Sequence, residues 1–276
     1  MAPTVLITGA SQGIGKATAW LFAQQGYDLI LAARQIDRLE ALANELRSQQ
    51  HQVLAIPTDV RDAEQVQSLM RTAIAQMGQI DVLVNNAGIY ISGAVEEFSL
   101  EDWHQAIDTN LWGYIHTIYA VLPHFLSQGK GTIVNVSSIG GKVPLPYLAP
   151  YTTSKFAITG LTEALNSELS AKGIHVGGVY PNIIKSNFLE RAIFRGKTQS
   201  DTQARRQQVE QVLQVPLIET PEDVAKAIWQ VVQHKHKQVI VGSANLSIAS
   251  HRLFPNVMQW IIRKTFQNQD TEAHAS

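Results

Sequence analysis

Short apolar runs alternate with longer stretches of helical period along the whole chain. Runs of about four to eight residues rich in β-branched side chains are typical of strands buried on both faces, and apolar positions three and four apart are typical of helices. The sequence Thr220-Pro221-Glu222-Asp223 is typical of a helix start with a capping box. The candidate strands are Val5–Thr8, Asp28–Ala33, Gln52–Pro57, Val82–Asn85, Thr132–Ser137, His175–Tyr180 and Gln238–Val241. The pattern predicts one α/β domain over residues 1–276, with a seven-stranded parallel sheet between two layers of helices.

The first candidate strand leads directly into a glycine-rich turn, Gly9–Gly15, which is followed by an alanine-rich helical stretch, Lys16–Gln25. Strand, glycine turn and helix in this order form the first unit of a dinucleotide-binding fold. The glycines let the backbone approach a pyrophosphate, and the helix N-terminus meets its charge. The alternative, a plain tight turn, does not account for the agreement of position, flanks and period. We therefore expect a Rossmann-type doubly wound sheet.

Composition excludes several classes of function. The chain has 276 residues, 45% of them hydrophobic, a formal net charge of -1 and no cysteine. No long run of one charge sign is present, so we expect no nucleic-acid partner. Disulfides and thiolate metal sites are ruled out, and the nine histidines show no metal-binding spacing, so we expect no metal. The N-terminus has no secretory pattern and no apolar stretch is long enough for a membrane span, which predicts a cytoplasmic protein.

A tyrosine and a lysine one helical turn apart, Tyr151 and Lys155, follow a serine, Ser138, that comes just after an apolar strand. On a helix the side chains at i and i+4 project from one face, so the ammonium can lie near the phenol. A free tyrosine has a pKa of about 10, and a neighbouring cation lowers it toward the working pH. The pattern therefore indicates acid-base chemistry at a carbonyl oxygen, although many surface helices match it by chance.

Several motifs together resemble the short-chain dehydrogenase/reductase family, in its compact single-domain branch. They are Thr8–Gly15, Asn85–Gly88, Asn110, Ser138, Tyr151 and Lys155, in the family's order and spacing, over roughly residues 4–190. The resemblance implies the strand order 3-2-1-4-5-6-7 and hydride transfer between a nicotinamide and a carbonyl or alcohol substrate. It also implies the catalytic roles. Tyr151 donates the proton, Ser138 orients the carbonyl oxygen, Lys155 lowers the tyrosine pKa and binds the nicotinamide ribose, and Asn110 holds a water on the proton path. For Asn110 a second interpretation stays open, a buried amide that stabilises a helix irregularity.

The resemblance further implies which residues bind the cofactor. These are Gly9, Ser11, Gln12, Gly13, Ile14, Gly15, Arg34, Arg38, Asp59, Val60, Asn86, Ala87, Gly88, Tyr151, Lys155, Pro181, Ile184 and Ser186. Asp59 matches the family acid that holds the adenine amine, with a helix cap near Arg61 as the alternative. Asn182 and Ser186 stand where glycine and threonine are usual. Asparagine tolerates a left-handed conformation, so the turn after Pro181 can be kept.

The end of the second candidate strand indicates which dinucleotide is bound. NAD-binding proteins usually carry an acid there, about 20 residues past the glycine turn. Here the strand ends in Ala33-Arg34. A guanidinium can grip a 2′-phosphate with paired hydrogen bonds, and Arg38 can assist, so we expect NADP(H). Two observations weaken this expectation. Asp37 lies close by, which leaves Arg34 as a solvated loop residue as the alternative, and Gln12 stands where NADP-preferring relatives often carry a second base.

Residues 186–215 occupy the position of the family's substrate lid. Apolar residues there and in neighbouring loops (Ile89, Tyr90, Leu145, Pro146, Tyr147 and Phe188) favour a lipophilic carbonyl or alcohol substrate. We expect substrate contacts from Ser138, Leu145, Tyr151, Asn182 and Phe188. The basic lid residues are Arg191, Arg195, Lys197, Arg205 and Arg206. They form either a solvated face or a contact for an acyl carrier protein or CoA, which gives a 3-oxoacyl thioester reductase as the alternative. An NADP-sensing regulatory protein is a third hypothesis, disfavoured by the complete Ser138, Tyr151 and Lys155 set.

A C-terminal extension, about 245–276, continues beyond the last candidate strand. Pro255–Phe266 has helical period, with Val257, Trp260 and Ile261 among its apolar residues. An apolar helix face covers another surface, which here is the substrate cleft, a neighbouring subunit or, least favoured, a membrane. For the whole protein we expect a homodimer or homotetramer.

Overall fold

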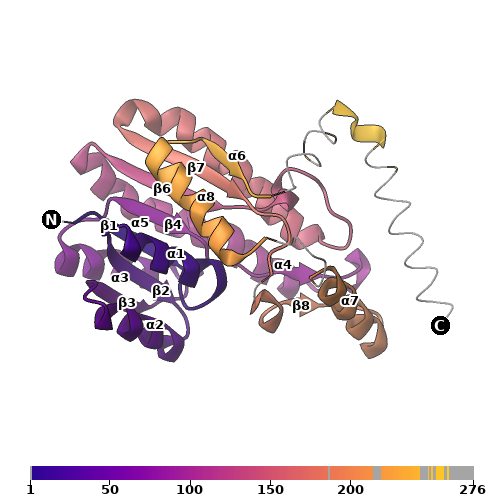
Figure 1. The fold of residues 1–276 in the computed structure, drawn as a ribbon. Helices are drawn as coiled ribbons and strands as arrows, with labels where there is room; N and C mark the ends of the chain where they lie inside the picture. The colour runs from indigo at the N-terminus through magenta and orange to yellow at the C-terminus, as the bar shows by residue number, and fades with distance from the viewer. Residues whose placement is uncertain are drawn as a thin grey trace.

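Seven parallel strands form the central sheet in the computed structural model of the chain (Figure 1). The structure describes residues 2–185, 187–213, 219–242, 248, 250, 253–257 and 260. The strands lie in the order β3-β2-β1-β4-β6-β7-β9, which is the order 3-2-1-4-5-6-7 when only this sheet is counted. Their bounds are β1 Thr4–Thr8, β2 Asp28–Ala33, β3 Val53–Pro57, β4 Val82–Asn85, β6 Gly131–Val136, β7 Ile174–Tyr180 and β9 Gln238–Ile240. The predicted doubly wound Rossmann-type sheet is confirmed, and the observed strand ends differ from the predicted ones by at most one residue.

Helices cover both faces of this sheet. Their bounds are α1 Gly13–Gln24, α2 Ile36–Ser48, α3 Ala63–Met77, α4 Leu100–Ile107, α5 Gly113–Gln128, α6 Ala149–Leu169, α7 Gln199–Val212 and α8 Pro221–His234. Helices α1, α2 and α8 contribute to one buried apolar cluster, and α3, α5 and α6 contribute to the other. Short 3-10 turns are η1 Val95–Glu97, η3 Ile139–Gly141, η4 Ser170–Lys172 and η5 Asn187–Glu190, and a π-helical turn, η2 Asp108–Trp112, joins α4 to α5.

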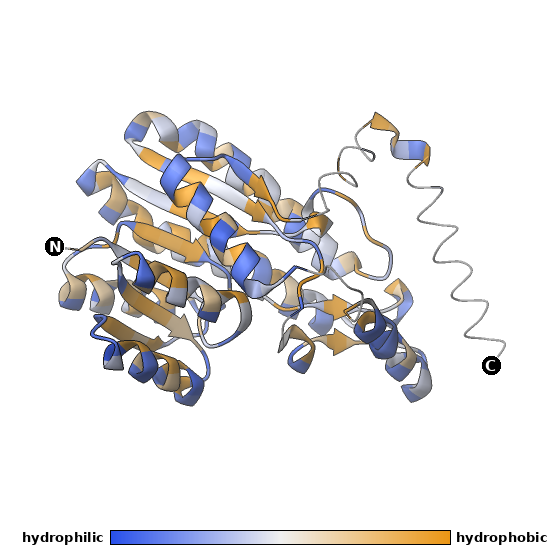
Figure 2. Cartoon of the chain, in the orientation of Figure 1, coloured by the Kyte–Doolittle hydropathy of each residue, from blue (hydrophilic) through white to orange (hydrophobic). Residues whose placement is uncertain are grey.

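The apolar strand runs follow from burial on two sides. Along β1, Val5 and Ile7 belong to one cluster, whereas Leu6 belongs to the other. Successive side chains of a strand point to opposite faces, so a strand covered on both faces is apolar at every position. Figure 2 shows hydrophobic colour along much of the central strands, with hydrophilic residues on the outer faces of the helices.

The first turns of helices α8 and α3 test two predictions made from the sequence. At α8 the Thr220 hydroxyl accepts from the Asp223 N–H while the Asp223 carboxylate accepts from the Thr220 N–H, so the predicted capping box is confirmed. At α3 the cap is Asp62, whose carboxylate accepts from the N–H groups of Glu64 and Gln65 at 2.9 and 3.1 Å. The alternative role of Asp59 as the helix cap is therefore wrong.

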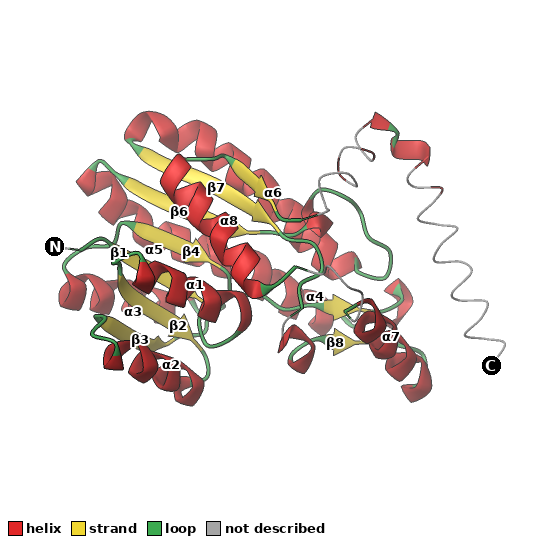
Figure 3. Ribbon diagram, in the orientation of Figure 1, coloured by secondary structure: helices red, strands yellow, loops and turns green. Residues whose placement is uncertain are grey.

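A second, two-stranded sheet lies beside the main one, formed by β5 (Ile91–Ser92) and β8 (Ile193–Phe194) in parallel (Figure 3). It connects the loop after β4 to the lid. The sequence did not predict it, because two-residue strands carry no periodic signal. Next to it, the Arg195 guanidinium bonds both oxygens of the Asp102 carboxylate at 2.6 and 2.9 Å. This pair fixes the lid to the start of α4.

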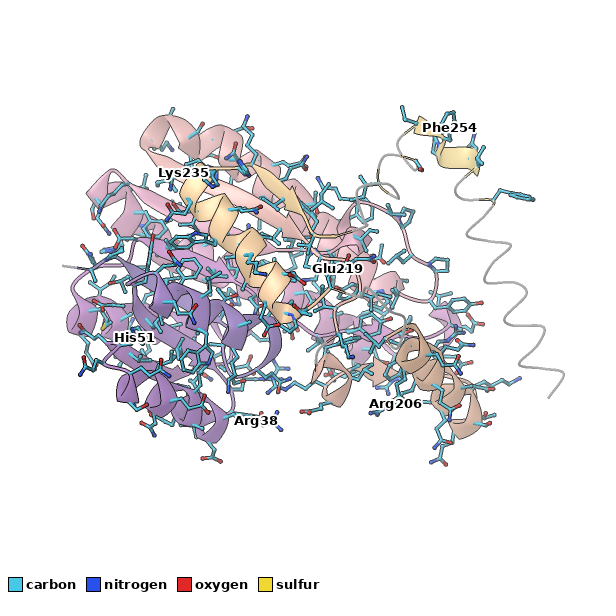
Figure 4. All side chains as sticks on the ribbon, in the orientation of Figure 1. Arg38, His51, Arg206, Glu219, Lys235 and Phe254 are labelled. Atoms are coloured by element: carbon cyan, nitrogen blue, oxygen red, sulfur yellow. The ribbon has the colours of Figure 1, made fainter. Side chains whose placement is uncertain are left out.

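The described part of the C-terminal extension is mostly exposed. Ile248 is buried against Ile139 and Val143, but the side chains of Leu253, Phe254, Val257 and Trp260 are exposed. Phe254 lies away from the body of the domain in Figure 4. The rest of the predicted Pro255–Phe266 helix lies outside the described residues. None of the helices that the structure describes has both the length and the apolar content of a membrane span.

Candidate active site

The glycine turn brings three backbone segments together at the start of α1. Gly9 has φ +66°, in the left-handed region, and a Cβ there would lie 2.9 Å from the Cα of Ala87. A Cβ on Gly15 would lie 2.3 Å from the Gly9 carbonyl oxygen. Both positions therefore require glycine for the fold of the turn itself. The hydroxyl of Ser11 is buried in this turn without a hydrogen-bond partner, which is the condition expected of a group that bonds a ligand.

Asn86 ties the end of β4 to the end of β1. Its side-chain amide donates to the carbonyls of Thr8 and Gly9 at 3.0 and 3.3 Å, and its N–H donates to the Thr8 hydroxyl at 3.0 Å. The Ala87 N–H donates to the same hydroxyl at 3.1 Å. Thr8 thus holds the two loops in register. These bonds bring Asn86, Ala87 and Gly88 to the carboxyl ends of the strands, where ligands bind in open α/β sheets.

A first cavity, of about 170 Å³, lies over the carboxyl ends of β1 and β2. It collects most of the residues that the sequence predicted for the cofactor. Its lining is Gly9, Gln12, Gly13, Ile14, Ala33, Arg34, Thr58, Asp59, Val60, Asn86, Ala87, Gly88, Ile89, Tyr90, Thr109, Phe188 and Arg191. Phe188 and Arg191 come from the lid. Sequence reasoning placed Phe188 at the substrate and did not assign Arg191 to this site, because no local pattern indicates where a lid residue ends up.

The acid predicted to hold the adenine amine is already engaged. The guanidinium of Arg61 bonds both oxygens of the Asp59 carboxylate, at 2.6 to 3.1 Å, and the Arg61 N–H adds a fourth bond at 3.1 Å. Burial raises the pKa of Asp59, but the bonds from Arg61 outweigh it and the net pKa is lowered. Asp59 faces the cavity as an anion with much of its acceptor capacity used. An adenine contact stays a prediction.

A second cavity, of about 220 Å³, is lined by Ser138, Tyr151 and Lys155, three of the four residues predicted to be catalytic, and we call it the catalytic cavity. The fourth, Asn110, does not line it. The catalytic cavity shares Ile14, Asn86, Gly88, Ile89, Tyr90 and Phe188 with the first cavity, so the two adjoin. Its other lining residues are Val136, Ser137, Ser138, Ile139, Leu145, Leu148, Tyr151, Lys155, Pro181, Asn182, Ile183, Ile184 and Val209. All five predicted substrate contacts lie here. Val209, from α7, was not predicted, because a single valine in a glutamine-rich helix gives no signal.

The phenol of Tyr151 is a half-buried acid that lines this cavity. It forms a hydrogen bond with the hydroxyl of Ser138, and its ring lies 5.3 Å from that of Tyr90. Burial raises the pKa of Tyr151, and the bond with Ser138 offsets this only in part. The sequence led us to expect a lowered pKa, and that expectation is wrong, because removal of the phenol from water outweighs the nearby cation. The phenol is therefore held in its proton-carrying form.

Lys155 lies one turn further along α6, as predicted. Its Nζ donates to the Val136 carbonyl at 3.0 Å and lies 5.7 Å from the Tyr151 ring centre. The same carbonyl accepts from the Tyr114 hydroxyl at 2.9 Å. Burial lowers the pKa of Lys155 to about 8. Tyr114 was not predicted, although its position places it directly beneath the lysine and shapes the lysine's surroundings.

The amide of Asn110 lies within the π-helical turn η2 and is buried. Its oxygen accepts from the Ile89 N–H at 2.8 Å, and its nitrogen donates to the Ile89 carbonyl and the Ser154 hydroxyl, both at 3.0 Å. These bonds stabilise an irregular helix against the loop after β4, which is the second interpretation of this residue. A role on the proton path stays a prediction.

The loop after β7 forms one wall of the catalytic cavity. Pro181, Asn182 and Ile184 all line it, and Ile184 forms a parallel bridge to Glu219. The Pro181 carbonyl accepts from the Ile139 N–H at 2.8 Å, which joins this loop to the segment after Ser138. Asn182 does not have a positive φ, so its replacement of glycine introduces no left-handed residue here. Ser186 lies outside the described residues.

The basic lid residues do not form one solvated face. Arg195 pairs with Asp102, which is only 1% exposed, and Arg206 pairs with Glu210 on the outside of α7. Arg205 stacks on the Tyr147 ring at 3.8 Å, at the loop that follows Ser138. Arg195, Arg205 and Arg206 thus have different partners. A contact of these charges with an acyl carrier protein or CoA stays a prediction.

Together the residues fit a dinucleotide. The glycine turn, the unpaired Ser11 hydroxyl and the N-terminus of α1 suit a pyrophosphate, and the adjoining cavities run from Arg34 to Tyr151. At the Tyr151 end the arrangement can orient a carbonyl oxygen and give it a proton. This chemistry needs a hydride donor, which a nicotinamide bound by these residues would supply.

Comparisons with known proteins agree with this geometry. The family model of short chain dehydrogenases matches residues 3–195. A 3-oxoacyl-[acyl-carrier-protein] reductase of Staphylococcus aureus is 35% identical over 204 residues, 74% of this chain and 83% of the relative. A short-chain dehydrogenase/reductase from Burkholderia phymatum, solved with NAD, has a TM-score of 0.85 at 25% identity and covers 93% of this chain and 95% of its own. The actinorhodin polyketide ketoreductase, solved with NADPH, has a TM-score of 0.76 at 27% identity, covering 88% of this chain and 95% of its own. Similar structures therefore exist with either dinucleotide.

Proposed function

The chain belongs to the short-chain dehydrogenase/reductase family, and from this premise we propose that it is an NADP(H)-dependent reductase of lipophilic carbonyl compounds, acting in reverse as an alcohol dehydrogenase. As a family member it is an oxidoreductase that uses a nicotinamide cofactor on C=O or CH–OH groups. The observation that carries the proposal is the Tyr151 phenol, bonded to Ser138 in an apolar cavity that adjoins the dinucleotide cavity. We further predict a cytoplasmic location.

The protein residues divide the reaction between them. The Ser138 hydroxyl orients the substrate oxygen, and the Tyr151 phenol gives it a proton in reduction and takes one in oxidation. The Tyr151 phenol carries its proton at neutral pH, as proton donation to the substrate oxygen requires. Lys155 is positioned to bind the nicotinamide ribose and to hold a positive charge near the phenolate that forms. When bound, the nicotinamide supplies or accepts the hydride.

The wall of the catalytic cavity supports a lipophilic substrate. Leu145, Leu148, Ile183, Phe188 and Val209 line it. Burial of apolar substrate surface against them contributes about 25 cal/mol per Å². The cavity volume, about 220 Å³, suits a compact carbonyl compound with an apolar substituent. A substrate of this kind gains affinity from the wall and places its single polar group at Ser138 and Tyr151.

A thioester reductase remains the second candidate, because the Staphylococcus aureus relative reduces 3-oxoacyl groups on an acyl carrier protein, as its name states. A substrate panel separates the two. We expect apolar ketones and aldehydes to consume NADPH with higher kcat/KM than acetoacetyl-CoA or an acetoacetyl carrier protein, measured by loss of NADPH absorbance. Higher kcat/KM with the thioesters would replace the first proposal by the second. Nucleotide binding without turnover on any compound would favour the sensor hypothesis.

Arg34 supports the choice of NADP(H), because it lines the dinucleotide cavity at the end of β2 with no acid at that strand end. A charge-assisted contact to the 2′-phosphate contributes about 1.5–3 kcal/mol, so NADPH should exceed NADH in kcat/KM by about ten- to a hundredfold. Arg34→Asp should reverse the preference, because a carboxylate repels the phosphate and accepts from the ribose hydroxyls. Steady-state kinetics with both cofactors measure this. Equal or better catalysis by the wild type with NADH would show that Arg34 is only a solvated residue.

A homo-oligomer is supported by an apolar stripe that begins at Trp112, the last residue of η2, and continues along α5. Trp112, Tyr119 and Leu126 recur every seven residues and are 48%, 74% and 44% exposed. A seven-residue repeat aligns side chains along one helix face and suits packing against the same helix of a second copy. We expect Tyr119→Arg to reduce the mass in size-exclusion chromatography with light scattering to that of a monomer. Leu100→Arg, at an exposed position off the stripe, should not. A wild type that is already monomeric contradicts the proposal.

A further inference from the structure

The segment that carries Glu190 and Arg191 is held at its far end by the small sheet. The Ile193 N–H donates to the Tyr90 carbonyl at 2.9 Å, and the Arg195 N–H donates to the Ser92 carbonyl at 2.8 Å. The buried Asp102 carboxylate fixes the Arg195 side chain. The short turn η5 that precedes these bonds is therefore anchored at its C-terminal side, and it extends across the dinucleotide cavity.

This turn contacts the adenosine side of the cavity, opposite the catalytic side. The Arg191 Nη2 donates to the Gln35 Oε1 at 2.7 Å, and the Arg38 Nη1 donates to the Glu190 Oε2 at 3.1 Å. Figure 4 shows Arg38 where α2 meets the lid. The Arg38 Nη1 also donates to the Gln12 Oε1 at 2.5 Å. Two bonds thus join the lid to the residues that follow β2.

Three guanidinium groups gather at this point, those of Arg34, Arg38 and Arg191. Burial and the nearby charges of Arg34 and Arg38 lower the pKa of Arg191. Two carboxylates lie nearby: Asp59 pairs with Arg61 and also interacts with the charge of Arg34, and Glu190 pairs with Arg38 and also interacts with the charge of Arg191. Among the described residues, Arg34 and Arg191 have no ion-pair partner within 4.0 Å, so an anion bound between them would relieve their mutual repulsion. The cavity that Arg34 and Arg191 both line is where such an anion fits.

The partner of Arg191 strengthens this interpretation. Gln35 is neutral, so its bond orients the guanidinium without neutralising the charge. Arg195, four residues later, has a carboxylate partner instead and is used for the fold. The Gln35 amide therefore holds the Arg191 guanidinium in place and leaves its positive charge and its other N–H donors available to bind a phosphate.

We propose that Arg191 is a specificity-determining residue, which together with Arg34 and Arg38 binds the 2′-phosphate of NADP(H) and so joins the lid to the cofactor. This rests on the proposed preference for NADP(H). The lid residues 187–195 are then held over the dinucleotide cavity by the phosphate that NADH lacks. Discrimination between the cofactors therefore comes from both sides of the cavity.

The test uses adenosine nucleotides without nicotinamide, so that catalysis plays no part. Binding of 2′,5′-ADP and 5′-AMP is measured by isothermal titration calorimetry for the wild type, Arg191→Gln and Arg191→Lys. We expect Arg191→Gln to weaken 2′,5′-ADP about tenfold, the loss of one charge-assisted hydrogen bond, and to leave 5′-AMP unchanged. Arg191→Lys keeps the charge and should recover part of the loss. Arg206→Gln, which removes a lid charge on the outside of α7, is the matched control and should change neither affinity.

Hydrogen exchange of residues 187–195 gives a second readout. In the wild type 2′,5′-ADP should slow exchange in this segment more than 5′-AMP does, and in Arg191→Gln the difference should disappear. If the wild type binds 2′,5′-ADP no tighter than 5′-AMP, the preference for NADP(H) fails and the role of Arg191 fails with it. If the wild type prefers 2′,5′-ADP and Arg191→Gln keeps both the affinity and the slowed exchange, only the inference on Arg191 is overturned.

Discussion

Tyr151→Phe is expected to lower kcat for carbonyl reduction by about 10²–10⁴-fold, the contribution of one general acid. Among the described residues of the catalytic cavity, the side chains with a titratable proton are Tyr90, Tyr151 and Lys155. Tyr151 alone bonds Ser138, the group that orients the substrate oxygen. The change removes one oxygen atom and leaves the ring in place, so NADPH affinity should change little. Single-turnover kinetics and a direct titration with NADPH measure the two effects separately.

Tyr90→Phe is the matched control for this experiment. Tyr90 lines the same cavity, its ring contacts Tyr151, and its phenol bonds the hydroxyl of Ser92 on β5. Burial raises the pKa of Tyr90 to about 12, so it is a weak acid held away from the oxygen-binding groups. Its loss should leave kcat nearly unchanged. Activity of Tyr151→Phe close to that of the wild type would remove the proposed mechanism, and an equal loss in both variants would point to a packing role for the two rings.

The strands of the central sheet could be predicted from the sequence because both faces of the sheet are buried. Each central strand is covered on both faces, so its consecutive residues are apolar, as at Val5, Leu6 and Ile7, and the sequence shows an uninterrupted apolar run. The glycine turn was predictable for a similar reason. A Cβ at Gly9 or Gly15 would collide with neighbouring backbone, and this local requirement appears directly as residue type. The strands β5 and β8 could not be predicted in this way, because a strand of two residues is too short to show a hydrophobic period.

Interactions between segments far apart in the chain account for what the sequence did not show. Arg195 bonds Asp102, 93 positions away, and Arg191 bonds Gln35, 156 positions away. Nothing in the lid sequence distinguishes these arginines from Arg206, which pairs within its own helix. The direction of the Tyr151 pKa was wrong for the same kind of reason. Helical spacing correctly placed a cation near the phenol, but the degree of burial is set by the loops that close over it.

Lys155→Met is expected to abolish turnover and yet raise the free energy of unfolding at neutral pH. Burial lowers the lysine pKa from 10.5 to about 8, and each pKa unit corresponds to 1.36 kcal/mol, so the buried charge costs about 3 kcal/mol. Methionine fills a similar space without a charge. The Val136 carbonyl loses the bond from Lys155 but keeps the bond from Tyr114, so it is not left unpaired. Removal of the ammonium should therefore stabilise the unliganded protein while it removes the ribose contact and the charge beside Tyr151.

The pH dependence of the free energy of unfolding shows whether the buried charge of Lys155 causes the difference between the two proteins. Between pH 8 and 10.5 the unfolded lysine binds a proton that the folded lysine has lost, so the stability of the wild type rises with pH through this window. Lys155→Met lacks that rise. Its advantage should be greatest below pH 8 and should vanish above pH 10.5, as measured by urea unfolding across the range. Lys142→Met is the contrast, because Lys142 pairs with Glu163 and lies over the Tyr180 ring, and its loss should not stabilise the protein. The contrary result is a Lys155→Met protein that is less stable than the wild type at pH 7. It would show that the folded protein stabilises the Lys155 ammonium, so that its position beside Tyr151 does not lower the free energy of unfolding.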